Sequence, residues 1–453
     1  MSSDARGFAT AQIHAGQDRG AAHGSRVIPI HLGSGFAFDD FDQARDRFAG
    51  DDDGYSYTRM GNPTAAAVER KLAALESGRE ALLVGSGQAA LTVAMLGLLR
   101  AGDHLLSSRH IYEGSRGLFR ENFAGFGIRV DFVDDIDDPD AWRRLIRPET
   151  RALFAESIAN PRNQVLDVPA IAAVAHEAGV PLVVDGTFAT PYLHRPLEWG
   201  ADLVVHSTSK FLSGHGAALG GAVIEAGTFD WAAEADRWPH LDTARHGDRA
   251  YLDFIRNTVA GRLGPTISPF NAFLLQQGIE TLSLRVERHS ANAATVAHWL
   301  EQQPEVASVD YAGLASSPSR AVVERLYPRG AGSVFAFTVH GGQTAAAALI
   351  ERLELFSHMS HLGDVRSLIL HPATTSHGRL SDGERAELGV TAGMLRVSIG
   401  IEDVDDLIRD LRRGLDAATR TVRAEDAAPV AAVASGNARD EILPNAAIAR
   451  SRG

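Results

Sequence analysis

Short apolar runs alternate with segments of helical periodicity along the first half of the chain. Several of these runs are apolar on both faces of a strand, and segments with apolar residues at helical spacing, such as 63–78 and 167–179, lie between them. Strands buried on both faces and joined by helices are typical of a mainly parallel sheet that is covered on each side. The predicted strands of this α/β domain are 80–85, 103–108, 129–134, 151–157, 181–186, 201–207 and 221–225.

The pattern changes near residue 264. From there apolar residues recur at helical spacing, through Leu282, Val286, Val296 and Leu300. Further strand-like and helical segments follow and predict a smaller α+β domain; the strands are 333–340 and 395–402, and the helices are 342–356 and 404–422. We therefore expect an N-terminal arm (1–61), a large domain (62–263), a C-terminal α+β domain (264–423) and a loosely ordered tail (424–453).

Composition excludes several kinds of protein. The 453 residues carry a formal net charge of −13, whereas domains that bind nucleic acid usually present a basic face, so we expect no nucleic-acid partner. The chain has no cysteine, which excludes disulfides, thiolate metal sites and a cysteine nucleophile. The N-terminus does not resemble a signal peptide, and together these features fit a cytoplasmic protein.

One uncharged stretch, 81–99, is long enough to cross a bilayer. Near its start, the four residues Gly-Ser-Gly-Gln at 85–88 would place polar backbone in lipid. We therefore interpret this stretch as a strand, a loop and a helix of a water-soluble domain, and we expect no membrane partner.

Unusual residues follow four of the predicted strands. One strand leads into the glycine turn at 85–88, a second into Asn160-Pro161, a third ends at Asp185, and a fourth leads into His-Ser-Thr-Ser-Lys at 206–210. In an open parallel sheet, ligands bind outside the carboxyl ends of the strands. The sequence therefore predicts a ligand site at this edge of the sheet.

Lysine is rare in this chain, which has only two and otherwise takes its positive charge from arginine. A lysine amine can lose its proton and form a Schiff base, whereas an arginine keeps its charge. Lys210, set among hydroxyls and glycines, is therefore the candidate for chemistry, and Lys71 is expected to be a solvent-facing helix residue. His206 and His215 flank Lys210 without a third ligand at metal spacing, so we interpret them as packing or hydrogen-bonding residues.

Two cofactors are compatible with this edge of the sheet. Gly85, Gly87 and Ala90 match G-x-G-x-x-A, a weak fingerprint of dinucleotide binding, so a nicotinamide-dependent oxidoreductase is the runner-up. Asp185 alone could equally cap the turn after its strand. A cofactor with an aldehyde for Lys210, a phosphate for the hydroxyls and the glycine turn, and a pyridine nitrogen for Asp185 is pyridoxal 5'-phosphate, which accounts for all of these features together.

At this point the chain resembles the pyridoxal-phosphate enzymes of cysteine and methionine metabolism, and within them the O-acetylhomoserine sulfhydrylases, over residues 10–420. The resemblance implies fold type I, the aspartate aminotransferase-like fold of these transferases, and a homo-oligomer (dimer or tetramer) with shared active sites. The motifs that carry it are "YTRMGNPT", "GSGQAALT", "ESIANP", "VVDGTFATPYLHRPLEWGADLVVHSTSKFLSGHG", "ISPFNAFLLQQGIETLSLRVERHS", "GDVRSLILHPATTSH" and "LRVSIGIEDVDDLIRDL".

The resemblance also implies a role for each motif residue. Lys210 would bind the cofactor covalently and move protons, Asp185 would hold the pyridinium, and Tyr112 would stack on the ring. Arg396 would bind the substrate carboxylate. The remaining residues would be Asn160, His361 and Glu113 near the substrate; Ser86, Gly87, Gln88, Asn160, Thr187, Ser207 and Ser209 around the cofactor; and Tyr57 and Arg59 contributed by a neighbouring subunit.

The implied reaction is γ-replacement, in which O-acetyl-L-homoserine and sulfide or methanethiol give homocysteine or methionine and acetate. Three residues near the reacting carbons depart from the family's pattern: Glu113 for glycine, Gly186 for asparagine, and His361 for asparagine or serine. They either reflect drift or reshape the pocket for an amine or carbon nucleophile. Cystathionine γ-synthase and methionine γ-lyase activities also stay open, although lyases of this family commonly place a cysteine where Gly114 stands.

Overall fold

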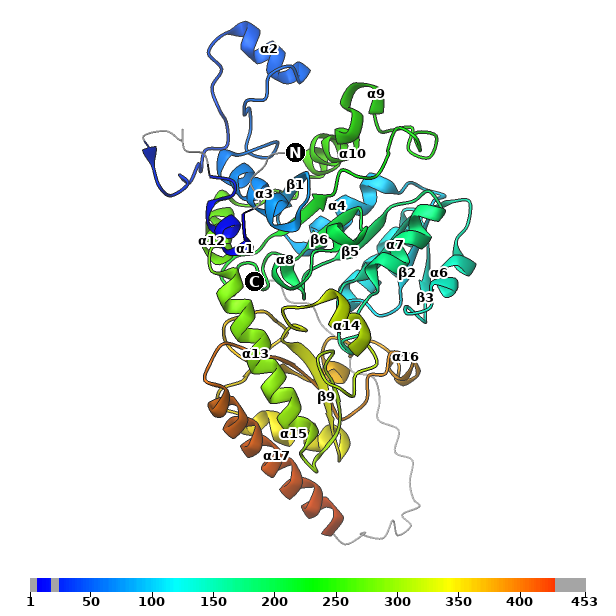
Figure 1. Cartoon of the computed structure of the whole chain (residues 1–453), viewed down its shortest axis with the longest axis vertical. Coiled ribbons are helices and arrows are strands. Elements are labelled where there is room, and N and C mark those ends of the chain that lie inside the picture. Colours follow the sequence, from blue (N-terminus) through cyan, green and yellow to red (C-terminus); the bar gives the residue numbers. More distant parts are fainter. Residues whose placement is uncertain (1–5, 18–23, 428–453) are drawn as a thin grey trace, which may run out of the picture.

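The structure is a computed structural model in which residues 6–17 and 24–427 are described (Figure 1). Its centre is a seven-stranded sheet with the order β1-β7-β6-β5-β4-β2-β3. All neighbouring strands are parallel except β7, which runs antiparallel to β1 and β6, so the mainly parallel sheet is confirmed. The strands are β1 (Glu80–Val84), β2 (His104–Ser108), β3 (Arg129–Val133), β4 (Thr150–Glu156), β5 (Leu182–Asp185), β6 (Leu203–His206) and β7 (Gly221–Glu225).

Side chains of the large sheet alternate between two covered faces. In β5, Val183 belongs to a buried cluster with residues of α4 and α10, whereas Leu182 and Val184 belong to a second cluster with residues of α6 and α7. Burial on both faces explains why the strands are apolar at successive positions. The helices here are α3 (Pro63–Glu76), α4 (Gly87–Leu98), α5 (Glu113–Gly117), α6 (Pro139–Leu145), α7 (Val168–Glu177), α8 (Thr190–Leu193), α9 (Thr243–His246), α10 (Ala250–Phe254) and α11 (Gly261–Leu263).

The uncharged stretch 81–99 forms most of β1, a turn and α4, as the glycine turn predicted. Its apolar side chains are buried in the large domain. Within the described residues, no helix is long and apolar enough to span a membrane.

The C-terminal part forms a second sheet of five strands in the order β10-β11-β12-β9-β8. The long helix α13 (Leu282–Glu301) leads from the large domain along this sheet (Figure 1) and buries the four apolar positions that the sequence pattern identified. The strands are β8 (Val306–Asp310), β9 (Val334–Val339), β10 (Ser357–His358), β11 (Leu368–Leu370) and β12 (Met394–Ser398), and the other helices are α12 (Pro269–Ile279), α14 (Arg320–Leu326), α15 (Gly342–Arg352), α16 (Asp382–Glu387) and α17 (Val404–Ala427).

The helix α17 continues beyond residue 424, where we expected the tail to begin. It packs against α15 at the outer side of the second sheet. The rest of the predicted tail, 428–453, lies outside the described residues.

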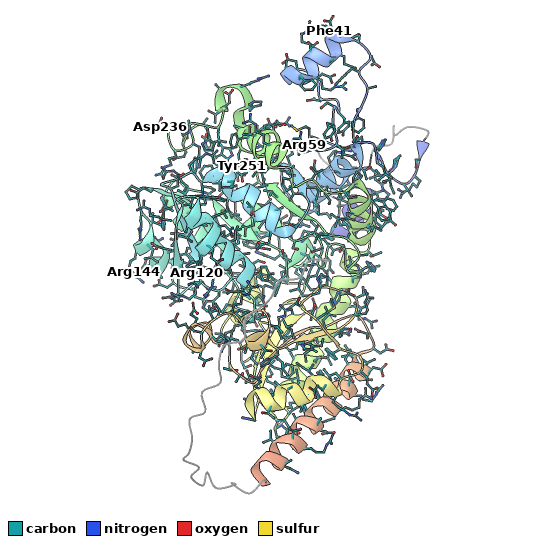
Figure 2. All side chains as sticks on the ribbon, turned by 180° about the vertical axis from the view of Figure 1, so that it is seen from behind. Phe41, Arg59, Arg120, Arg144, Asp236 and Tyr251 are labelled. Atoms are coloured by element: carbon teal, nitrogen blue, oxygen red, sulfur yellow. The ribbon has the colours of Figure 1, made fainter. Side chains whose placement is uncertain are left out.

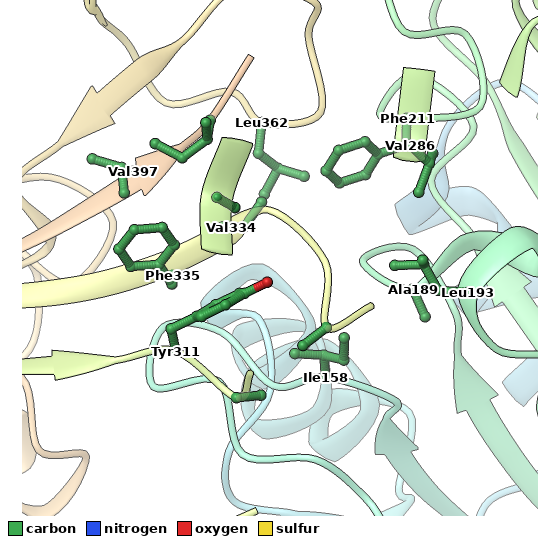
Figure 3. Close-up of a cluster of buried hydrophobic side chains, with 14 of the residues drawn as sticks. Ile158, Ala189, Leu193, Phe211, Val286, Tyr311, Val334, Phe335, Leu362 and Val397 are labelled. Carbon is green, nitrogen blue, oxygen red and sulfur yellow. The ribbon is translucent and has the colours of Figure 1, made fainter. Parts of the chain in front are cut away.

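A continuous buried cluster joins the two sheets (Figure 3). Ile158 and Leu193 from the large domain and Tyr311 from the C-terminal part belong to it. Phe211 and Leu362 also belong to it, and they directly follow Lys210 and His361 in the chain. Packing of this cluster therefore holds the segments that carry these two site residues.

The N-terminal region contains two helices, α1 (Phe8–His14) and α2 (Phe41–Ala49). α1 packs against α3 and α13, whereas α2 projects from the body of the molecule (Figure 1) and meets it at its last residue, where Arg245 donates to the carbonyl of Ala49 (2.7 Å). Phe41 and Phe48 of α2 are 83% and 80% exposed, and Phe41 is labelled at the outer end of the molecule in Figure 2. Two exposed phenylalanines on one short helix mark an apolar surface that the chain itself does not cover.

Lys71 is not solvent-facing, as we expected, but fully buried. Its amine donates hydrogen bonds to the backbone carbonyls of Gln12 (2.7 Å) and Ile13 (2.9 Å), and lies 3.9 Å from Glu280. These carbonyls belong to the last turn of α1, where they have no partner within the helix and attract a cation. Burial lowers the pKa of Lys71 to about 8. The expectation was wrong because α1 covers the face of α3 that carries Lys71.

Replacing Lys71 by methionine is expected to destabilise the protein by about 2 kcal/mol, because the carbonyls of Gln12 and Ile13 lose their donor. Because the pKa of Lys71 is lower in the folded chain, the unfolded chain holds more protons between about pH 8 and about pH 10, and this site adds stability as the pH rises through that window. Urea unfolding at several pH values measures both effects. Equal midpoints for the two proteins at every pH would show that the contact contributes nothing.

Candidate active site

The carboxyl ends of β4, β5 and β6 meet at one edge of the sheet. Glu156 is aligned with Asp185, and Asp185 with Val205, in the register of these parallel strands. Beyond the strand ends, the hydroxyl of Thr187 accepts a hydrogen bond from the backbone N–H of Ser207 (2.9 Å). This bond joins the segment that leads from β6 to Lys210 to the segment that follows Asp185. The sequence predicted that these segments meet at one edge of the sheet.

The first turn of α4 and the hydroxyls after β6 form a cradle that suits a phosphate. Ser86 is the N-cap of α4, and its hydroxyl accepts from the backbone N–H of Ala89 (3.1 Å). A Cβ on Gly87 would lie 2.6 Å from the Cβ of Ser207, so only glycine fits this approach. The hydroxyls of Ser207 and Ser209 are 3.0 Å apart. Free N–H groups at a helix N-terminus beside paired hydroxyls are a recurrent phosphate site.

Replacing Gly87 by alanine is expected to weaken binding of pyridoxal phosphate by about tenfold or more, because the added methyl group forces the turn away from Ser207. Titration of the cofactor-free chain with pyridoxal phosphate, followed by absorbance, gives the dissociation constant. Gly125 is the matched control, because a Cβ there would meet nothing within 4 Å. Unchanged affinity in Gly87→Ala would contradict a phosphate site at this turn.

Asp185 lies at the base of the site without a cationic partner. Its carboxylate accepts from the backbone N–H of Thr187 (2.8 Å), so it does cap the turn, but it forms no ion pair among the described residues. Burial raises the pKa of Asp185, while the hydrogen bonds from Thr187 oppose the shift. A buried carboxylate needs a positive partner. The protonated nitrogen of a pyridine ring would supply one.

Glu156 is a site residue that the sequence reasoning missed. Its two carboxylate oxygens accept from the backbone N–H groups of Tyr112 (2.6 Å) and Asn160 (3.2 Å), so it holds both segments at the site. Burial, and then the charge of Asp185, raise the pKa of Glu156 well above its usual range. Its position at the end of a strand, like that of Asp185, was the available signal.

Tyr112 and Asn160 present free groups to the site. Tyr112 is 47% exposed, and its ring lies over Gly114, where a Cβ would come within 2.4 Å of it. The side-chain oxygen of Asn160 is buried without a hydrogen-bond partner in the described chain. An open aromatic ring and an unpartnered amide oxygen are consistent with a planar cofactor that stacks on one residue and bonds to the other.

Lys210, His361 and Arg396 form a contiguous group. The amine of Lys210 lies 3.0 Å from Nδ1 of His361, and Arg396 donates to the backbone carbonyl of His361 (3.0 Å). Burial, and then the charge of Arg396, lower the pKa of Lys210 to about 8. The Nε of Arg396 is buried and has no hydrogen-bond partner in the described chain, which leaves donors for a carboxylate.

Two of the three departures from the family's pattern have local structural reasons. Glu113 forms an ion pair with Arg116 (3.2 Å), and burial raises the pKa of Glu113 while Arg116 opposes the shift. Gly186 lies against His206, whose Cε1 would be 2.7 Å from a Cβ at this position. Arg116 was also missed from the sequence, although its spacing of three residues from Glu113 on a helix was a signal.

Gln88 lies in the first turn of α4, whereas Tyr57 and Arg59 lie apart from this group. Arg59 stacks over the ring of Tyr57 (5.6 Å) and donates to the carbonyl of Gly261. Neither residue forms a hydrogen bond or ion pair with Lys210 or with the phosphate cradle among the described residues. Both line a cavity of about 1200 Å³ that also borders Val84 and Thr266. The chain alone therefore does not bring Tyr57 and Arg59 to the amine.

Residues 9–416 match the family model described as Cys/Met metabolism PLP-dependent enzyme. The chain belongs to this family. It is 44% identical to the O-acetyl-L-homoserine sulfhydrylase of Corynebacterium glutamicum over 91% of this chain and 98% of that protein, and 39% identical to that of Leptospira meyeri over 90% and 96%. A crystal structure of a putative O-acetylhomoserine (thiol)-lyase from Campylobacter jejuni, which contains N'-pyridoxyl-lysine-5'-monophosphate, matches with a TM-score of 0.87 and 34% identity over 91% of this chain and 100% of that one.

These relationships settle the choice of cofactor and the fold class. The family uses pyridoxal phosphate, so the nicotinamide interpretation of the glycine turn is wrong and the pyridoxal phosphate interpretation is confirmed. The sheet and the second domain are those of fold type I, as the sequence predicted. The chain is therefore a pyridoxal-phosphate-dependent enzyme of the sulfhydrylase type.

Proposed function

We propose that the chain catalyses γ-replacement on O-acetyl-L-homoserine, in which sulfide displaces acetate to give homocysteine. The bond between Cγ and the acetate oxygen breaks, and a bond between Cγ and sulfur forms. The observation that carries the proposal is the contiguous group of Lys210, His361 and Arg396 beside the predicted cofactor cradle. The amine of Lys210 can move protons while Arg396 holds the amino-acid carboxylate.

Bound pyridoxal phosphate supplies an aldehyde that bonds to amines and a ring that accepts electrons from the substrate. The residues of the chain position this chemistry. Ser207, Ser209 and the first turn of α4 would bind the phosphate, and Tyr112 would cover one face of the ring. The carboxylate of Asp185 would hold a proton on the ring nitrogen, which would make the ring a stronger electron acceptor.

The proton transfers fall to Lys210. With the cofactor bound, the amine of Lys210 would remove the proton from Cα and then one from the neighbouring carbon, so that acetate could leave from Cγ. A pKa of about 8 suits this role, because a useful fraction of the amine is then unprotonated near neutral pH while the ammonium can still return its proton. Arg396 keeps Cα within reach of the amine by gripping the carboxylate with two donors.

We further infer that the active enzyme is a homo-oligomer in which each site receives Tyr57 and Arg59 from a neighbouring subunit. The exposed Phe41 and Phe48 of α2 support an interface, because a large apolar surface on a protruding helix is typical of a subunit contact. The cavity beside Tyr57 and Arg59 offers room for part of the second chain.

The test of the proposed reaction uses the enzyme loaded with pyridoxal phosphate and O-acetyl-L-homoserine, with and without sulfide. Mass spectrometry follows the amino-acid and keto-acid products. Homocysteine that forms only with sulfide is the expected result. Release of 2-oxobutanoate without added sulfide would instead indicate a γ-lyase, and loss of acetate without either product would point to another nucleophile.

A further inference from the structure

Lys210 has one hydrogen-bonding side-chain partner among the described residues, the imidazole of His361 at 3.0 Å. Because the lysine ammonium can only donate, Nδ1 of the imidazole accepts, which places the ring proton on Nε2. The same residue accepts a hydrogen bond from Arg396 through its backbone carbonyl. His361 thus touches the reactive amine with its side chain and the carboxylate-binding arginine with its backbone.

Backbone contacts hold the loop that carries His361 against the segment that carries Lys210. A Cβ on Gly363 would lie 2.6 Å from the backbone nitrogen of Phe211, so the loop after His361 packs directly on the residue after Lys210. The backbone N–H of Val365 donates to the carbonyl of Gly214 (2.9 Å). Phe211 and Leu362 continue the contact inside the buried cluster (Figure 3). The loop at 361–365 is therefore docked along the segment that carries Lys210.

We propose that His361 is the positioning residue of Lys210: Nδ1 accepts the hydrogen bond of the lysine ammonium after it has taken a proton, and so directs the amine toward the substrate carbons. The inference deepens the proposed function, on which it rests only in taking Lys210 as the reactive amine. It gives one of the three departures from the family's pattern a specific task.

The alternative in which His361 takes the proton away from Lys210 is disfavoured. Burial, and then the charge of Lys210, lower the pKa of His361 to about 4, whereas that of Lys210 is about 8. The order of these two pKa values keeps the proton on the amine rather than on the imidazole. The charged groups that face this pair are Arg396 and Asp364. The imidazole therefore holds the ammonium as a neutral acceptor.

The test measures the pKa of Lys210 directly in the full-length chain after removal of the cofactor. Brief treatment with a trace of light acetic anhydride over a range of pH, then unfolding and complete labelling with the heavy reagent, gives the fraction of free amine by peptide mass spectrometry. The chain has only two lysines, and Lys71 is fully buried whereas Lys210 is partly exposed, so the signal belongs to one residue.

His361→Leu and His361→Asn form a matched pair of nearly equal size, one without an acceptor and one with an amide oxygen. Removing the acceptor is expected to lower the pKa of Lys210 by about one unit, because a hydrogen bond from a charged donor stabilises the ammonium. His361→Asn is expected to restore most of the shift. His194→Asn, the loss of a buried histidine whose pKa is likewise about 4, is the control and should leave the profile unchanged.

A pKa that stays within a few tenths of a unit in His361→Leu, or that rises, overturns the proposal. If the leucine variant does not fold, His361→Val provides the same comparison with the asparagine variant. The measurement needs no substrate, so it is independent of the proposed reaction. With substrate, His361→Leu should lower kcat about tenfold and leave KM nearly unchanged, because the backbone carbonyl that binds Arg396 remains.

Discussion

Replacing Lys210 by alanine is expected to lower homocysteine formation by about 1,000-fold or more, because the variant loses both the covalent attachment of the cofactor and the group that moves protons at Cα. The rate is measured from the product with saturating pyridoxal phosphate, and the absorbance of the bound cofactor reports the lost covalent link. The phosphate cradle and Asp185 are intact in this variant, so it should still bind the cofactor.

The second lysine of the chain provides the matched control. Lys71→Met also removes a buried amine, but one that binds the end of α1 rather than the site. Its turnover at 25 °C should stay within about twofold of the unaltered enzyme, although it unfolds more easily. A Lys210→Ala variant that retained more than about a tenth of the activity would show that another group moves the protons.

The inactive variant also tests the shared site. In a dimer of one Lys210→Ala chain and one Arg59→Ala chain, one site has both defects and the other has neither. Random mixing gives such dimers half of the time, so about a quarter of the full activity should return from two nearly inactive proteins. If mixing restores nothing after the subunits have exchanged, each chain uses its own Arg59 and the proposed interface is wrong.

The apolar pattern predicted the large sheet well because its strands are buried on both faces. Each of the seven predicted runs is a strand, and the glycine turn at 85–88 separates β1 from α4 as expected. The antiparallel direction of β7 could not be predicted, since burial is the same in either direction. The chemistry-bearing residues were found because they follow the strands that end at one edge.

The errors concern residues whose environment depends on contacts distant in sequence. Lys71 seemed to face water because its own helix is amphipathic, and the helix that covers it lies about 60 residues earlier in the chain. Glu156 ends a strand, as Asp185 does, but its bonds to the backbone of Tyr112 and Asn160 depend on the fold. Arg116 is the exception, because its partner Glu113 lies only three residues away. Contacts between residues distant in sequence are known only when the fold brings the partners together. Sequence patterns therefore identified the reactive groups better than the residues that support them.

The neighbours of the three departures from the family's pattern show which of them can affect the reaction. Gly186 gives room to His206, which lies 2.5 Å from Glu76 in a fully buried pair, so a larger residue here would disturb the core beneath the site. Glu113 forms an ion pair with Arg116, so its carboxylate is not free to bind an amine nucleophile. Only His361 touches the reactive amine. The pocket therefore offers little support for a change of nucleophile.

Asp185→Asn is the most informative substitution at the base of the site. The amide keeps the shape of the side chain and one oxygen for the N–H of Thr187, so the turn after β5 should remain. What disappears is the negative charge proposed to hold a proton on the ring nitrogen. Glu156 cannot replace it, because burial raises its pKa and its oxygens already bind the backbone of Tyr112 and Asn160.

We therefore expect Asp185→Asn to lower kcat by about 100- to 1,000-fold, the usual cost of removing one group that stabilises developing charge. Steady-state kinetics and a pyridoxal phosphate titration separate the loss of turnover from a loss of cofactor. Asp202→Asn is the control, since Asp202 is also a buried carboxylate of this sheet but pairs with His176 at the opposite end of β6. Turnover within about threefold of the unaltered enzyme in Asp185→Asn would mean that the ring works without a proton held by this carboxylate, and the role assigned to Asp185 would have to be abandoned.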